Sequence, residues 1–259
     1  MPVHPALLDI AEDSPISLTP YVEGRLFRNH RTLGLADCGS DGRLRFDAAA
    51  RIAQDIAASD LGDSGLEDEG VWVVRRTHIR FFGAPRYRET LLVSTFCAGT
   101  GRSWAQRRTS LVGEGSRVEI SSLWVQTDPS SRSPRSLSPR FFDVFGPSAQ
   151  GRRVGTRLEL LDQQPEYAVV PWQPRVTDID ILGHTNNAAY FEAVEEVSRR
   201  SGLPSAASTE IFALAEYRDG VEDGEEAELR LSNADTDGFQ LDFYARGKRQ
   251  CSLAFGAAI

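Results

Sequence analysis

The sequence repeats one pattern, a long helix followed by about four strands, once in each half of the chain. Residues 46–62 place small and apolar side chains three and four positions apart, which predicts a helix that ends at Gly62. Residues 186–202 carry the same spacing, with Asn186 or Asn187 as a suitable N-cap. A shift of 140 residues aligns Ala48, Ala49, Ala53, Asp55 and Gly62 with Ala188, Ala189, Ala193, Glu195 and Gly202. The repeat predicts two copies of one structural unit in the chain.

After each predicted helix the pattern changes to β-rich runs separated by glycine, proline and charged turns. The first set covers residues 71–82, 90–97, 103–112 and 117–126, and the second covers residues 210–218, 227–232, 238–246 and 250–258. A short strand is expected ahead of each helix. This order predicts an α+β fold in which a curved antiparallel sheet wraps a long helix in each unit. The two units would pair their sheets edge to edge and so protect the sheet edges.

The composition of the chain changes at three places, which gives the predicted domain bounds. Residues 1–20 form an N-terminal tail, 21–128 the first unit, 129–165 a linker and 166–259 the second unit. The linker is rich in serine, proline, arginine and glycine, with room for one short helical piece.

Charge and hydropathy exclude several classes of protein. A net charge of −8 argues against a nucleic-acid binder, whose affinity depends on neutralising phosphates. No apolar run is long enough to span a bilayer. The first residues lack the layout of a secretory signal, so the cytoplasm is the expected compartment. The three cysteines are far apart and form neither a zinc motif nor a disulfide framework.

Of the four histidines, His184 has the environment that best fits chemistry. It lies just ahead of the second predicted helix, six residues after Asp178 and four after Asp180. A helix N-terminus offers free N–H groups that can stabilise an oxyanion, and a nearby carboxylate can activate water or attack directly. The histidine can then orient a group or donate a proton. The same residues also fit a structural role, in which the aspartates and Asn186 cap the turn.

Residues 178–190, Asp-Ile-Asp-Ile-Leu-Gly-His-Thr-Asn-Asn-Ala-Ala-Tyr, resemble the D-x-D-x-x-x-H-x-N-N-x-x-Y signature of hotdog-fold thioesterases. Three further segments, in the same order along the chain, are similar to the acyl-ACP thioesterase family of plants and bacteria. They are Trp-Val-Val-Arg-Arg-Thr-His-Ile-Arg at 72–80, Ser-Ser-Leu-Trp-Val at 121–125 and Glu-Tyr-Arg at 216–218. The resemblance implies two tandem hotdog units, each a long helix wrapped by a curved antiparallel sheet.

The resemblance also implies an activity and a site. The activity is a thioester hydrolase that releases free fatty acid from an acyl-[acyl-carrier-protein], with no metal and no organic cofactor. By position in the signature, Asp180 and His184 are the expected catalytic residues, and Asn186 and Asn187 are expected to position the thioester. The second unit is therefore expected to be the catalytic half.

The sequence departs from the family pattern at three positions of the expected site. Leu182 stands where the family has asparagine, Gly220 where it has glutamate, and Val221 where it has cysteine. A leucine cannot hold water by hydrogen bonds, and a glycine cannot act as a base. Acids nearby could replace the glutamate, and the candidates are Glu196, Asp219 and Glu222.

The first unit is expected to hold the acyl chain. Its counterpart turn, residues 37–42, contains no histidine, so a second catalytic site is not expected there. The residues expected to line the shared substrate cleft are Gln54, Asp55 and Trp72.

The expected partner is an acyl carrier protein bearing an acyl chain, and the protein is expected to be a monomer or a homodimer. Carrier proteins are acidic, so the arginines near the linker, among them Arg132 and Arg135, are candidate docking points. Three alternatives stay open. They are an acyl-CoA thioesterase, a hotdog dehydratase, and a catalytically inactive hotdog protein that binds acyl thioesters.

Overall fold

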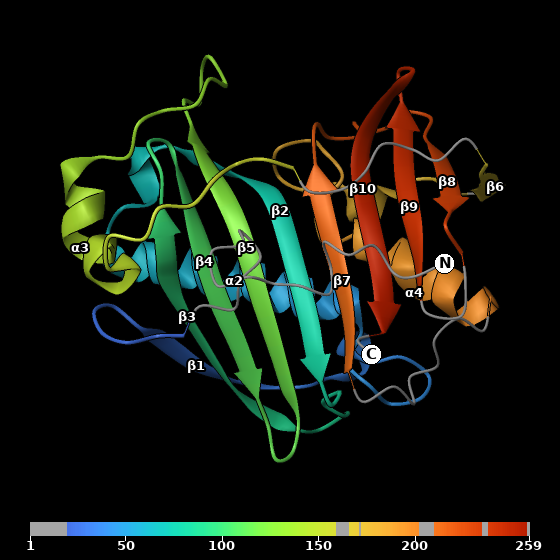
Figure 1. Ribbon diagram of the computed structural model, residues 1–259, viewed down its shortest axis with the longest axis horizontal. Helices are drawn as coiled ribbons and strands as arrows, with labels where there is room; N and C mark the ends of the chain where they lie inside the picture. The colour runs from blue at the N-terminus through green and yellow to red at the C-terminus, as the bar shows by residue number, and fades with distance from the viewer. Residues whose placement is uncertain (1–19, 159–165, 171, 202–209, 235–237, 258–259) are drawn as a thin grey trace.

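One antiparallel sheet of ten strands dominates the computed structural model, which describes residues 20–158, 166–170, 172–201, 210–234 and 238–257 (Figure 1). Its order is β1-β3-β4-β5-β2-β7-β10-β9-β8-β6. The strands of the first half are β1 (Phe27–Thr32), β2 (Val71–Phe82), β3 (Thr90–Thr100), β4 (Trp104–Val112) and β5 (Arg117–Thr127). Those of the second half are β6 (Ala168–Val170), β7 (Glu210–Tyr217), β8 (Glu228–Ser232), β9 (Gly238–Ala245) and β10 (Lys248–Ala257).

The strand order of the first half recurs, reversed, in the second half. The two halves meet where β2 pairs with β7, from Arg76 opposite Glu216 to Phe82 opposite Glu210. The predicted edge-to-edge pairing and the eight predicted strands are therefore confirmed, with ends that differ by a few residues at most. Residues 1–19 of the predicted tail and 159–165 of the predicted linker lie outside the described residues, and the predicted domain bounds stay predictions.

Two long helices, α2 (Phe46–Ser64) and α4 (Tyr190–Ser201), lie on the same face of the sheet (Figure 1). Small residues of α2 such as Ala49 and Ala53 are buried, which lets the helix approach the strands closely. The ring of Phe46 contacts Phe81 of β2 and Phe255 of β10, with centroids 4.7 Å and 5.6 Å apart. One hydrophobic core therefore runs through both halves.

The helix predicted over residues 186–202 begins four residues late, because the asparagines ahead of it form a turn. The Asn186 side chain accepts the N–H of Ala188 at 2.9 Å, and the Asn187 carbonyl accepts the Tyr217 hydroxyl at 2.8 Å. α2 ends close to the predicted place, at Ser64, where Gly65 adopts a left-handed conformation (φ 68°) that favours glycine.

The linker contains the expected helical piece, α3 (Pro139–Ala149). Ser138 caps it by accepting the N–H of Phe141 at 3.0 Å. α3 packs beside β3 at one end of the sheet (Figure 1) and covers a second, smaller hydrophobic cluster. Trp72 belongs to this cluster, with its ring 5.6 Å from Phe141. No helix among the described residues is long and apolar enough to cross a membrane.

A buried carboxylate ties the end of α2 to its surroundings. Asp60 is fully buried, accepts the Arg25 Nε at 2.6 Å and is also bound by Arg107. The guanidinium groups of Arg25 and Arg107 lie 5.7 Å and 5.4 Å from the ring of Phe145 in α3. This cluster joins α2, α3 and β4, because removing the charge in its centre would leave two arginines unpaired.

We predict that Asp60→Ala lowers the free energy of unfolding by about 3 kcal/mol, because the substitution leaves both guanidinium groups without their central anion. The neighbouring Asp63 also pairs with Arg25 but is 59% exposed, so Asp63→Ala is the matched control and costs at most about 0.5 kcal/mol. Chemical denaturation measures both values. Equal losses in the two variants would contradict this account.

Candidate active site

The segment that carries Asp180 and His184 forms a tight turn between the short 3₁₀ helix η3 (Val176–Asp178) and α4. The Asp180 N–H donates to the carbonyl of His184 at 2.9 Å, and the Gly183 N–H donates to the carbonyl of Asp180 at 3.0 Å. The Asp180 carboxylate accepts the N–H of Leu182 at 2.9 Å. Gly183 has φ 79°, a backbone conformation that a residue with a side chain rarely adopts. The turn therefore holds Asp180 and His184 on one short loop.

The imidazole of His184 packs directly against Gly220. A Cβ built on Gly220 would lie 3.0 Å from the His184 Cβ and 3.2 Å from its Cγ and Cδ2. The departure from the family's glutamate thus has a physical counterpart, because any side chain at position 220 would push the histidine ring from its place. His184 and Glu222 also form an isolated antiparallel bridge through their backbones.

The three acids expected to replace that glutamate have other partners. The carboxylates of Asp219 and Glu222 lie 3.4 Å and 3.2 Å from the guanidinium of Arg246. Glu196 lies on the exposed side of α4 and pairs with Arg200. Among the described residues, no side-chain contact brings any of the three to Asp180 or His184.

Two buried tyrosines hold the turn against the sheet. The Tyr190 hydroxyl accepts the N–H of Val221 at 3.1 Å, and the Tyr217 hydroxyl donates to the carbonyl of Asn187. Burial raises the pKa of both phenols, so both stay neutral at physiological pH. The rings pack edge to face with centroids 5.7 Å apart. The sequence analysis gave these tyrosines no role in the site.

The same turn occurs once in each half, at positions 141 residues apart. In the first half the Gly39 N–H donates to Arg43 O (2.8 Å), Gly42 to Gly39 O (2.9 Å), Leu44 to Pro85 O (2.8 Å) and Arg45 to Asp37 O (3.1 Å). In the second half Asp180 donates to His184 O (2.9 Å), Gly183 to Asp180 O (3.0 Å), Thr185 to Val221 O (2.8 Å) and Asn186 to Asp178 O (2.7 Å). The alignment by 140 residues is therefore wrong by one position here, because it compared helix composition without the turns.

The corrected alignment shows how far the first turn has diverged. Gly39 takes the place of Asp180, and Arg43 takes the place of His184. The expectation that the first half lacks a second copy of these residues therefore agrees with the geometry.

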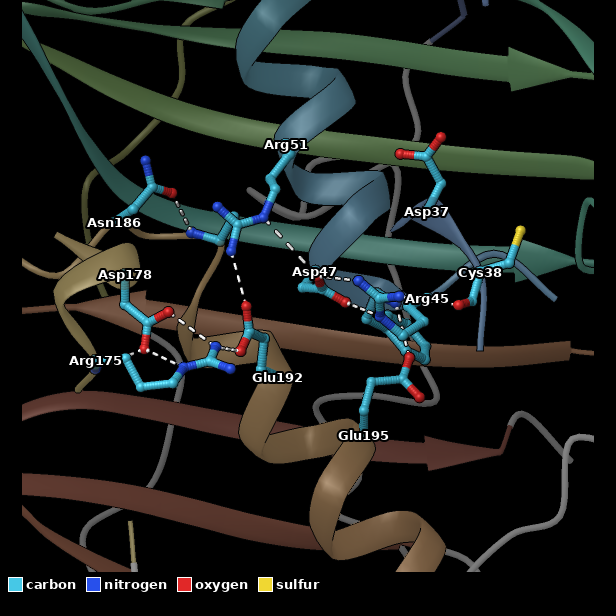
Figure 2. Close-up of polar contacts among 12 residues, drawn as sticks. Asp37, Cys38, Arg45, Asp47, Arg51, Arg175, Asp178, Asn186, Glu192 and Glu195 are labelled. Atoms are coloured by element: carbon cyan, nitrogen blue, oxygen red, sulfur yellow. Dashed lines mark hydrogen bonds and ion pairs between the residues drawn. The ribbon is translucent and has the colours of Figure 1, made fainter. Parts of the chain in front are cut away.

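The helix that follows the first turn is closed by a carboxylate from the other half (Figure 2). Glu195 of α4 accepts the N–H of Phe46, the first residue of α2, at 2.8 Å. Arg45 donates two hydrogen bonds to the buried Asp47, at 2.8 Å and 2.9 Å. Burial is the largest cause that raises the pKa of Glu195, and the charge of Asp47 adds to it. Charged side chains thus fill the N-terminal end of α2.

The corresponding end of α4 is open. Asn187 is the equivalent of Phe46, and no acceptor in the described part of the chain takes its N–H. The equivalent of Glu195 is Gln54, which is half-buried and carries no charge. A free N–H at a helix N-terminus can donate to a carbonyl oxygen or an oxyanion. This N–H and the two side chains of the turn make the second half the better candidate for chemistry.

The remaining predicted site residues are more dispersed. Asp55 is exposed on α2, and Trp72 lies in the cluster under α3. Arg132 and Arg135 are exposed in the turn that follows β5. No group of three or more His, Cys, Asp or Glu side chains within the described residues could hold a metal ion.

Comparison with known proteins gives matches along most of the chain. Residues 24–145 match the family described as acyl-ACP thioesterase N-terminal domain, and residues 161–255 match the acyl-ACP thioesterase C-terminal domain. The chain is 27% identical to the uncharacterized protein Rv2001 of Mycobacterium tuberculosis, over 82% of this chain and 84% of that protein. It is 27% identical to the chloroplastic acyl-[acyl-carrier-protein] hydrolase FATB2 of Cuphea viscosissima, over 72% of this chain and 50% of that protein.

Two solved structures show the fold. A putative oleoyl thioesterase from Lactobacillus plantarum superposes with a TM-score of 0.73 at 18% identity, covering 90% of this chain and 96% of that one. The 12:0-ACP thioesterase from Umbellularia californica gives a TM-score of 0.71 at 18% identity, covering 91% and 98%. The predicted α+β hotdog fold is confirmed, whereas its division into two tandem units stays a prediction that the repeated turn and strand order support.

We predict that Glu195→Gln stabilises the protein at pH 8 and that the gain shrinks as the pH falls towards 4.5, the ordinary pKa of the group. The folded state raises the pKa of Glu195, so the folded state binds this proton more tightly than the unfolded chain does. Stability contributed by the protonated form is then lost as the pH rises through the folded pKa. Glutamine removes that loss and can still accept the Phe46 N–H.

Chemical denaturation of the wild type and of Glu195→Gln at pH 4.5 and pH 8 measures this difference. A gain that is the same at both pH values, or a loss at pH 8, would contradict the raised pKa.

Proposed function

The chain belongs to the acyl-ACP thioesterase family, and on that premise we propose that it hydrolyses acyl-ACP thioesters to a free fatty acid and the carrier thiol. The observation that carries the proposal is the open turn of the second half. There, Asp180 and His184 lie on one loop, and the Asn187 N–H is free of acceptors within the described residues. The matching turn of the first half is closed by Glu195 and has neither side chain.

The proposed reaction begins with the thioester carbonyl at the N-terminal end of α4. The Asn187 N–H donates to the carbonyl oxygen and stabilises the negative charge that develops on it. Asp180 accepts a proton from water as the water oxygen attacks the carbonyl carbon. The C–S bond then breaks, and His184 donates a proton to the departing thiolate or orients it. Asp180 as a direct nucleophile is the variant of this scheme in which water enters at the second step.

The Asn186 side chain serves the site by holding the backbone. Its oxygen is taken by the N–H of Ala188, and its own N–H by the carbonyl of Asp178. These bonds shape the turn so that the next N–H, that of Asn187, points away from the helix interior. Asn186 is therefore proposed to position the donor indirectly, and Asn187 to supply it.

The first half is proposed to bind the acyl chain. Its turn is filled by Arg45, Asp47 and Glu195, so no thioester group is expected there. α2 faces the sheet with small buried residues, and Gln54 lies at the position that corresponds to Glu195. Gln54 is thus the residue of the first half that is proposed to face the thioester.

The donor is proposed to be an acyl carrier protein, with Arg132 and Arg135 in the turn after β5 as candidate docking points for its acidic surface. An acyl-CoA thioesterase would use the same turn, and rates on the two donors side by side separate the two. A protein that binds acyl thioesters without cleaving them is the second candidate, because Leu182 is 43% exposed and Gly220 leaves no carboxylate beside His184.

We predict that Asp180→Asn lowers thiol release from acyl-ACP by roughly 100-fold or more, because the amide cannot take a proton from water. The asparagine oxygen can still accept the N–H of Leu182, so the turn is expected to keep its shape. The rate of thiol release under saturating acyl-ACP is the measurement.

Asp41→Asn is the matched control, since Asp41 accepts the N–H of Arg43 at 3.0 Å in the first turn, just as Asp180 accepts that of Leu182. Its rate should equal that of the wild type. If Asp180→Asn were as fast as its control, the site assignment would be wrong. If the wild type bound acyl-ACP and released no thiol, the binding-only alternative would hold.

A further inference from the structure

Four charged side chains connect α2 to the turn that carries Asp180 (Figure 2). Glu192 of α4 accepts the Arg51 Nη2 of α2 at 2.8 Å and is also bound by Arg175, which lies just ahead of the turn. Arg175 in turn donates through Nη2 to Asp178 at 2.8 Å. We refer to Arg51, Glu192, Arg175 and Asp178 as the ionic bridge.

The ionic bridge ends on the backbone of the proposed site. The Asp178 carbonyl accepts the N–H of Asn186 at 2.7 Å, and Asn187, the proposed carbonyl donor, is the next residue. No printed contact joins a side chain of the bridge to Asp180 or His184 among the described residues. Its members can therefore act on the reaction only through the position of the turn.

We propose that Glu192 is a positioning residue, which fixes the turn with Asp180 and His184 relative to the helix of the acyl-binding half. The inference rests on the proposed function, and it assigns the site a dependence on the first half of the chain. Glu192 is the member that receives both arginines, so it is the single point at which the connection can be cut.

The first turn shows that the bridge is not required for folding. The N–H of Gly34 donates to the Asp37 carboxylate at 2.7 Å, as the N–H of Arg175 donates to Asp178 at 2.9 Å. Gly34 has no side chain, and yet the backbone of this turn follows the same pattern. The guanidinium of Arg175 is thus an addition found only beside the turn that has Asp180 and His184.

The pair at the centre of the bridge is also an addition. Arg51 and Glu192 are 141 residues apart, so they occupy equivalent positions in the two copies of the repeat. Two identical copies would place like residues there, and like charges would repel. Opposite charges at equivalent positions link the halves in one arrangement only.

The exposure of the bridge separates a positioning role from a purely stabilising one. The side chains of Arg51, Glu192 and Arg175 are 38%, 28% and 60% exposed. Ion pairs with this much exposure add little to stability, because water screens the charges and ordering long side chains costs entropy. A displacement of a reacting group by about 1 Å, in contrast, can slow catalysis by as much as roughly 100-fold.

The test compares Glu192→Gln and Arg175→Gln with the wild type in acyl-ACP hydrolysis. For both variants we expect kcat to fall by roughly 10-fold, with KM changed by less than about twofold, because the turn and not the acyl pocket is affected. The melting temperature should change by no more than about 2 °C. Arg51→Gln combined with Glu192→Gln should be no slower than the slower single variant, since both act through one connection.

Arg31→Gln is the matched control. Arg31 pairs with Asp37 at 3.0 Å in the first turn, where the equivalent of Asp178 lies, and its side chain is 43% exposed. The substitution removes an arginine of similar exposure from a turn without Asp180 and His184, so kcat should stay at the value of the wild type.

Amide hydrogen exchange supplies a readout that does not depend on hydrolysis. In Glu192→Gln the amides of residues 180–186 should exchange roughly 10-fold faster, whereas those of residues 39–45 should keep their rate. If the wild type released no thiol, the proposed function would fail, and the exchange data would still decide whether Glu192 fixes the turn. Unchanged exchange at residues 180–186, an equal rise in both turns, or a kcat of Glu192→Gln equal to that of Arg31→Gln would overturn the inference.

Discussion

The hydrogen bond from the Phe46 N–H to Glu195 makes the two halves of this molecule chemically different. Both halves build the same turn ahead of a helix, and each turn places one N–H at the start of that helix where a carbonyl could bind. In the first half a carboxylate from α4 takes this N–H, at the cost of burying a charge, as the raised pKa of Glu195 records. In the second half Gln54 stands in place of the carboxylate, and Asn187 keeps its N–H for a ligand.

The rest of the arrangement follows from this asymmetry. The pairing of β2 with β7 sets α2 and α4 side by side, so each helix can reach the start of the other. Glu195 uses that proximity to close one turn, and Glu192 uses it to connect the other turn to α2 through Arg51. A duplicated chain can place different residues at equivalent positions, which two identical subunits cannot do. We therefore regard the second half as the place of chemistry and the first half as its support.

Much of the fold could be predicted because periodicity records it. The alternation of residues 71–82 gave β2 with its observed bounds, and the spacing of small residues gave α2 within two residues at its end. The start of α4 could not be predicted from spacing, because the side chains of Asn186 and Tyr217 hold residues 186–189 in a turn. Trp72 could not be placed either, since α3 and the cluster beneath it depend on packing between distant segments.

The site was predictable where one segment carries it. Asp180, His184 and Asn187 lie within a single signature, so the sequence alone was enough to select them. The partners of Asp219, Glu222 and Glu196 were not predictable, because each acid lies near the turn in sequence and is bound by an arginine in space. The roles of Glu192 and Glu195 depend on contacts between the halves, and an alignment wrong by one residue hid the pairing of Arg51 with Glu192.

The most direct test of this account is the amide NMR signal of Asn187 and of Phe46 when an acyl-pantetheine ketone analogue binds, in which a methylene replaces the thioester sulfur. The carbonyl of the analogue should bind the free N–H, so the Asn187 signal should shift downfield as the analogue saturates the site. The Phe46 signal should stay in place, because Glu195 holds its N–H. A shift of Phe46 with Asn187 unchanged would contradict the account, since it would put the carbonyl at the turn that we describe as closed.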